Sequence, residues 1–190
     1  MEDFNLYFSI GIEHILTWEA LDHLLFITAL CLQYTVKEWK KVALLVTAFT
    51  IGHSITLMLS ALKYIALPVT LIEFLIPLTI AAAAIVNLWR PATKTHVVRP
   101  AVYFLALFFG LIHGMAYATT ILDLEGSEGL VGHVFAFNVG IEIAQLLVVA
   151  VVLFISFILV HAIRVPGLIW VKIGSLIIFL VSIQLSLERW

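Results

Sequence analysis

The chain of 190 residues is 63% hydrophobic and only 12% charged, with a formal net charge of −2. Soluble domains are typically about 45–50% apolar and about 25% charged, so this composition excludes an ordinary soluble domain, a disordered chain and a coiled coil. The mean hydropathy of +1.15 indicates a polytopic membrane protein instead. Because about 20 apolar residues cross a bilayer as a helix, the whole chain is expected to form a single integral membrane domain over residues 1–190. The charge gives no reason to expect a nucleic-acid partner.

Six apolar segments are predicted to be transmembrane helices, and a short N-terminal half-helix at residues 5–16 precedes them. The spans are expected at residues 18–34, 42–62, 67–88, 100–121, 131–163 and 167–187. Pro68 and Pro77 are expected to bend the third span. The fifth segment is too long for one upright helix, so it must tilt, extend beyond the bilayer or break near Gly140. The predicted fold class is therefore an all-α polytopic transmembrane bundle.

Basic residues gather on one side of the predicted bundle. Eight of the ten lysines and arginines fall there, namely Lys37, Lys40, Lys41, Arg90, Lys94, Arg99, Arg164 and Lys172. The opposite side carries only Lys63 and Arg189, and one of its loops is acidic. The positive-inside rule makes the basic side cytoplasmic, so we expect both termini outside (N-out and C-out). No internal repeat is apparent, so an inverted-repeat transporter is not expected.

Ionisable side chains inside the apolar segments are the most informative residues, because placing them in a bilayer is costly and usually marks function. They are Glu13, His14, Asp22, His23, His53, Glu73, His113, His133 and Glu142, and Asn138 and Gln145 join them. With the inferred topology, all of them lie at or above the bilayer midplane on the outer side. The simplest arrangement is a single polar site close to the extracytoplasmic face.

The residue types in this set favour a divalent transition metal. Imidazoles and carboxylates without a thiol suit nickel, zinc, cobalt, iron or copper(II), whereas calcium and magnesium prefer oxygen ligands. The predicted metal ligands are His14, Asp22, His23, His53, His113 and Glu142, and the predicted supporting residues are Glu73, His133, Asn138, Gln145, Gly110 and Gly114.

Helix geometry refines this prediction. Asp22 and His23 point about 100° apart on a helix, so only one of them is expected to reach the centre. The other can orient a ligating histidine, as carboxylates often do. Gly110 and Gly114 flank His113 as a pair of small residues, which would let a neighbouring helix approach it.

Five sequence blocks carry a family resemblance, in order and across nearly the whole chain: residues 14–16, 21–26, 49–57, 110–114 and 137–142. They resemble the HupE/UreJ family of small integral membrane proteins, which is linked to nickel supply for hydrogenase and urease. The resemblance implies a secondary metal permease, not driven by ATP, with nickel as the favoured ion. Two positions differ from the family's nickel permeases: Phe109 stands in place of a histidine and Ala116 in place of a glutamate.

Three classes of function stay open at this point. The favoured class is a metal permease, although the inner halves of the spans offer few polar groups, mainly Thr47, Asn87, Ser156 and His161. A membrane-embedded metalloenzyme with zinc or two metals could activate water, but no known hydrolase motif occurs, so an enzyme is less favoured. The third class is a structural or sensory protein in which a bound metal stabilises the helical bundle. The expected partners are a metal ion and the lipid of a bacterial inner (plasma) membrane, and a homo-oligomer is compatible with the sequence.

Overall fold

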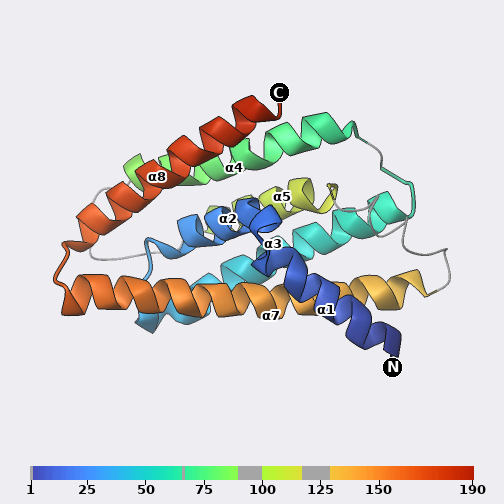
Figure 1. The fold of residues 1–190 in the computed structure, drawn as a ribbon, viewed down its shortest axis with the longest axis horizontal. Coiled ribbons are helices and arrows are strands. Elements are labelled where there is room, and N and C mark those ends of the chain that lie inside the picture. The colour runs from blue at the N-terminus through green and yellow to red at the C-terminus, as the bar shows by residue number, and fades with distance from the viewer. Residues whose placement is uncertain (1, 66, 90–99, 117–128) are drawn as a thin grey trace.

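The computed structural model describes residues 2–65, 67–89, 100–116 and 129–190. These residues are helical almost throughout, and the α-helices are α1 (Glu2–Leu16), α2 (Leu21–Cys31), α3 (Trp39–Ala61), α4 (Val69–Trp89), α5 (Pro100–Gly114), α7 (Leu130–Phe157) and α8 (Gly167–Glu188). In Figure 1, α4 and α8 lie along one side of an elongated bundle and α7 lies along the other. The short helix α2 lies between these two sides.

The prediction of an all-helical membrane protein is confirmed. Within the described residues, four helical stretches are long and apolar enough to cross a membrane, and two apolar helices are shorter. The four long stretches are Val36–Ala61, Val69–Trp89, Leu130–Ala162 and Gly167–Glu188, and the shorter helices are Leu21–Cys31 and Val102–Gly114.

The segment predicted as the first span is not one continuous helix. Thr17 has an extended backbone, and the chain then forms a short 3-10 helix, η1 (Trp18–Ala20), before α2 begins. With 11 residues, α2 is about 17 Å long, which is roughly half the thickness of a bilayer core. The break places the first turn of α2 in the interior of the bundle, where α1 ends.

The other predicted segments agree with the structure to within a few residues where they are described. α4 continues through Pro77. α7 runs through Gly140 without a break and continues as a π-helix, η3 (Ile158–Ala162), so the long fifth segment extends and does not break in the middle. Residues 117–121 of the predicted fourth span lie outside the described residues.

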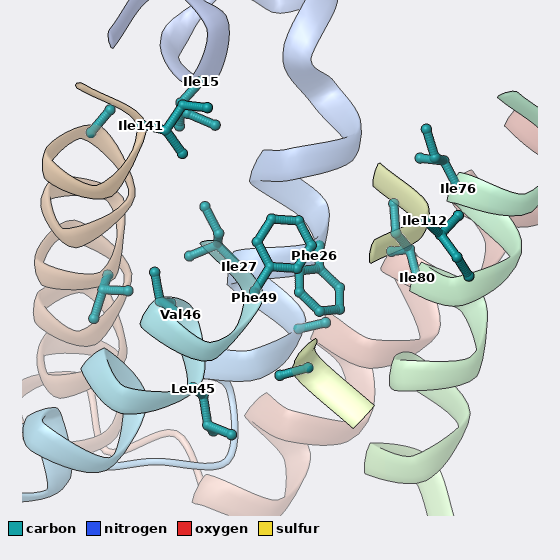
Figure 2. Close-up of a cluster of buried hydrophobic side chains, with 14 of the residues drawn as sticks. Ile15, Phe26, Ile27, Leu45, Val46, Phe49, Ile76, Ile80, Ile112 and Ile141 are labelled. Carbon is teal, nitrogen blue, oxygen red and sulfur yellow. The ribbon is translucent and has the colours of Figure 1, made fainter. Parts of the chain in front are cut away.

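A buried apolar core surrounds α2. Figure 2 shows Phe26 of α2 beside Phe49 of α3, with ring centroids 4.9 Å apart. Ile80 of α4 and Ile141 of α7 are both fully buried and lie on either side of this pair. Because α2 is enclosed on several sides, the polar residues of its first turn face the interior of the protein.

The α1–α7 pair approaches through two glycines. A Cβ atom added to Gly11 would overlap the backbone carbonyl of Phe137, and one added to Gly140 would overlap that of Phe8. Gly11 therefore faces Phe137, three positions before Gly140, and Gly140 faces Phe8, three positions before Gly11. Small residues allow such close backbone approach in membrane helices.

The α3–α5 pair uses the same arrangement. A Cβ atom on Gly52 would overlap the carbonyl of Leu107, and one on Gly110 would overlap that of Phe49. In Figure 1, α1 and α7 run in one direction, and α3 and α5 run in the opposite direction. A Phe/Leu-x-x-Gly element thus occurs in all four helices, and the two helix pairs run in opposite directions. The sequence showed no apparent repeat, because a pattern of four residues is too short to stand out in an apolar chain.

Candidate metal centre

Three histidines from three helices meet inside the bundle. His14 lies in the last turn of α1, His23 lies near the start of α2, and His53 lies in the second half of α3. Their candidate ligand atoms all lie within 4.8 Å of one another. The donors of one tetrahedral ion lie about 3.4 Å apart, given metal–nitrogen bonds of about 2.0–2.1 Å. Small side-chain rotations would therefore let the three imidazoles, called the histidine triad below, share one metal ion.

Two members of the triad, His23 and His53, are buried and have ring nitrogens available to a ligand. His53 is fully buried, and neither of its ring nitrogens has a hydrogen-bond partner among the described residues. Nε2 of His23 also lacks such a partner. Buried polar atoms nearly always have a partner, so ring nitrogens that no protein group engages are suited to bind a ligand. Neutral imidazole nitrogen is a donor that borderline divalent metals prefer.

His113 of α5 lies beside the triad. Its ring centroid is 5.3 Å from that of His23, and its Nε2 lies 3.3 Å from the hydroxyl oxygen of Thr79. Nδ1 of His113 is buried and has no hydrogen-bond partner in the described part of the chain. A Cβ on Gly114 would overlap the backbone carbonyl of His53, so glycine at this position allows α5 to come close enough to bring His113 to the site.

Asp22, next to His23 at the start of α2, is paired with the C-terminal end of the chain. Its Oδ2 accepts a hydrogen bond of 2.7 Å from Nη1 of Arg189, just after α8. Its Oδ1 is buried without a hydrogen-bond partner in the residues described. Of the two adjacent residues, His23 thus lies against the other imidazoles and Asp22 lies against the guanidinium. Arg189 was not among the predicted site residues. In the sequence it is marked only as one of two basic residues on the outer side.

Glu142 and Gln145 of α7 contact two threonines of α3. The hydroxyl of Thr47 donates a hydrogen bond of 2.6 Å to Oε1 of Glu142, and the hydroxyl of Thr50 lies 2.8 Å from Oε1 of Gln145. The sequence predicted that Glu142 would join the histidines as a ligand. In the described structure one oxygen of its carboxylate bonds to Thr47, and its role as a ligand stays a prediction.

The other predicted supporting residues lie in varied surroundings. Glu73 is exposed on α4. His133 stacks on Tyr7 of α1, with ring centroids 4.2 Å apart. Asn138 is buried and adjoins His53; its amide nitrogen donates to the carbonyl of Val134, and its Oδ1 has no hydrogen-bond partner among the described residues. Asn138 is therefore the supporting residue that contacts the site.

These features define an α-helical membrane protein with buried imidazoles where several helices converge. The family model described as HupE / UreJ protein matches residues 1–189. The chain therefore belongs to the HupE/UreJ family, as the sequence resemblance predicted. Comparison with curated proteins and with solved structures gives no match.

Proposed function

We propose that this protein is a permease for a divalent transition-metal cation, and that the histidine triad is where it binds the cation. The observation that carries the proposal is the convergence of His14, His23 and His53 from three helices, with ligand atoms within 4.8 Å of one another. Imidazole donors suit nickel, cobalt, zinc, iron and copper(II) alike. Membership of the HupE/UreJ family favours nickel among them.

Two neighbouring groups would complete the ligand set. Nδ1 of His113 and Oδ1 of Asp22 are buried donors without hydrogen-bond partners among the described residues. With the triad they give a set of several nitrogens and one carboxylate oxygen, which suits a divalent cation that is losing its hydration shell. The negative charge of Asp22 would offset part of the charge of the cation in this low-dielectric interior.

The helix break beside the triad offers carbonyl oxygens to a cation, and Asp22 in the first turn of α2 offsets the positive end of that helix. The carbonyl end of α1, where His14 lies, meets the start of α2 across Thr17 and η1. The C-terminal end of a helix carries a partial negative charge, and transporters use the ends of broken helices to coordinate ions near the bilayer midplane.

We further propose that six membrane segments follow α1 and that both termini lie outside in a bacterial inner membrane. The loop before α3 and the turn between α7 and α8 carry Lys37 and Arg164 on the same side. The positive-inside rule makes that side cytoplasmic. Cations would then enter the triad from the outer side.

The direct test is nickel uptake by the purified protein in liposomes that contain a metal-sensitive dye, together with elemental analysis of the same preparation. We expect about one equivalent of bound Ni²⁺ after loading, since one triad holds one ion, and saturable uptake that empty liposomes lack. Folded protein that neither binds nor transports Ni²⁺, Co²⁺ or Zn²⁺ would refute the proposal. Tight binding without uptake would favour a structural, sensory or enzymatic role.

Arg189→Met tests the ion pair with Asp22. The change removes the charge and keeps most of the side-chain length. The side chains of Arg189 and Asp22 are 28% and 12% exposed, so losing the pair should cost the metal-free protein about 1–3 kcal/mol, less than for a fully buried pair. Because the carboxylate is then free for a cation, the rise in melting temperature caused by Ni²⁺ should exceed that of the wild type.

The measurement is thermal unfolding in detergent with and without Ni²⁺. Lys37→Met is the matched control, since Lys37 is exposed in the short 3-10 helix η2 (Val36–Glu38) that precedes α3. It should leave both melting temperatures unchanged. A smaller Ni²⁺ effect in Arg189→Met than in the wild type would show that the guanidinium helps to build the site and does not compete with the cation.

A further inference from the structure

Four polar side chains form a second cluster between α3 and α7. Thr47 and Thr50 of α3 bond to Glu142 and Gln145 of α7, respectively. Gln145 is fully buried and Thr50 is 7% exposed. Oε2 of Glu142 and Nε2 of Gln145 are both buried, and neither has a hydrogen-bond partner among the described residues. The cluster therefore has polar atoms to offer to a ligand.

The open carboxylate oxygen of Glu142 is an acceptor, and the hydrogen bonds of Thr50 allow Gln145 to present its oxygen as well. The hydroxyl oxygen of Thr50 lies 2.8 Å from Oε1 of Gln145 and 3.2 Å from the carbonyl of Val46, but a hydroxyl has only one proton to donate. The oxygen and nitrogen of an amide side chain are nearly equivalent in shape, so the Gln145 amide can be flipped. When the Thr50 hydroxyl donates to Val46, the flipped amide of Gln145 donates to Thr50 through its nitrogen. The oxygen of Gln145 then becomes the atom without a partner, beside the open carboxylate oxygen of Glu142.

The cluster lies along α3 from His53, the member of the triad on that helix. Thr50 and Thr47 precede His53 on α3 by three and six residues, which is about 4.5 and 9 Å along the helix axis. They lie toward the end of α3 where Lys40 and Lys41 are found. On α7, Asn138 adjoins His53 and precedes Glu142 by four residues, which places both on one helix face.

We propose that Glu142, Gln145, Thr47 and Thr50 form a second binding site for the transported divalent cation, inward of the histidine triad. The inference rests on the proposed function. A carboxylate, an amide and two hydroxyl oxygens form an all-oxygen site, which holds nickel or cobalt more weakly than imidazoles do. The triad would capture the cation from outside, and the oxygen site would pass it on toward the cytoplasm. Asn138, which adjoins His53 and precedes Glu142 by four residues, has a buried Oδ1 without a hydrogen-bond partner among the described residues.

Glu142→Gln in proteoliposomes is the primary test, with NiCl2 as the probe. The variant keeps the shape of the side chain and can still bond to Thr47. Binding of the first Ni²⁺ equivalent, measured by calorimetry in detergent, should stay within about twofold of the wild type because the triad is a separate site. Uptake should fall by about tenfold or more, because the inner site loses its only negative charge in a low-dielectric environment.

Further variants separate a binding role from a structural one. Glu142→Asp keeps the carboxylate and should recover part of the uptake. Thr47→Val leaves the carboxylate in place and removes the hydroxyl that orients it, so uptake should fall by a smaller factor. Asp3→Asn is the matched control, because Asp3 is exposed near the N-terminus, and its uptake should equal that of the wild type.

Three results would overturn the inner site. Uptake by Glu142→Gln equal to the wild type would show that the carboxylate is not needed. Loss of the first Ni²⁺ equivalent would place Glu142 in the triad itself. Equal loss of uptake and of thermal stability in the Gln and Asp variants would show a purely structural role. If the wild type neither binds nor transports Ni²⁺, the proposed function fails instead, and the two failures are thereby distinguished.

Discussion

His53→Ala is expected to abolish Ni²⁺ binding and uptake. His53 is the fully buried member of the triad, and its removal leaves only two imidazoles from α1 and α2. Loss of a partner that merely orients a ligand already costs about 10–100-fold in metal affinity, so loss of a ligand should exceed about 100-fold. The measurement is a Ni²⁺ titration in detergent, followed by uptake in proteoliposomes.

The same variant should change the stability of the metal-free protein only slightly. Removing a buried side chain leaves a cavity, which costs about 2–4 kcal/mol. It also removes two buried ring nitrogens without hydrogen-bond partners among the described residues, which relieves a penalty of about 1–3 kcal/mol each. The two effects offset each other, so thermal unfolding without metal should stay close to the wild type while the stabilisation by Ni²⁺ disappears.

His161→Ala is the matched control for this experiment. His161 is exposed in η3 and stacks on Phe157, with ring centroids 4.7 Å apart. It should keep full Ni²⁺ affinity and uptake. If His161→Ala lost as much binding as His53→Ala, surface histidines and not the triad would bind the metal.

Gly110→Ala is expected to have the largest effect on folding. The added Cβ would overlap the carbonyl oxygen of Phe49 and lie 3.0 Å from the backbone nitrogen of His53. Backbone atoms cannot rotate away, so α5 must separate from α3. Such overpacking costs typically about 1–3 kcal/mol, and here the upper end or more is expected because rigid backbone is in the way. The separation would also move His113 away from the triad and lower Ni²⁺ affinity.

Thermal unfolding and the yield of monodisperse protein after gel filtration measure this effect. Gly132→Ala is the matched control, because nothing lies within 4 Å of a Cβ at that position on α7. Alanine favours a helix over glycine by about 0.8–1.0 kcal/mol, so this variant should be as stable as the wild type or slightly more stable. Equal behaviour of the two variants would contradict the close α3–α5 contact.

The sequence predicted the membrane class, the helical architecture and the family. These properties depend on composition and on hydropathy within single segments, both of which can be read without knowing how the helices pack. The same reading found His14, His23 and His53, since ionisable residues in apolar segments stand out wherever they point. It did not predict the 3-10 helix η1 that replaces the first turn of the expected span and shortens α2, because the apolar run continues through these residues.

Only the tertiary structure decided which polar residues meet. Asp22 pairs with Arg189, which lies 167 residues further along the chain, and Thr47 pairs with Glu142 across 95 residues. The physical reason is that a contact depends on the rotation of each helix about its axis and on how closely the helices cross. Glycines such as Gly52 and Gly110 allow close crossing, because each lies against the backbone of the facing helix. Hydropathy contains no information on helix rotation or on the distance between helices. The sequence by itself thus determined that this membrane protein holds buried imidazoles and carboxylates, and the packing of its helices decided that three imidazoles come together and that Glu142 bonds to Thr47.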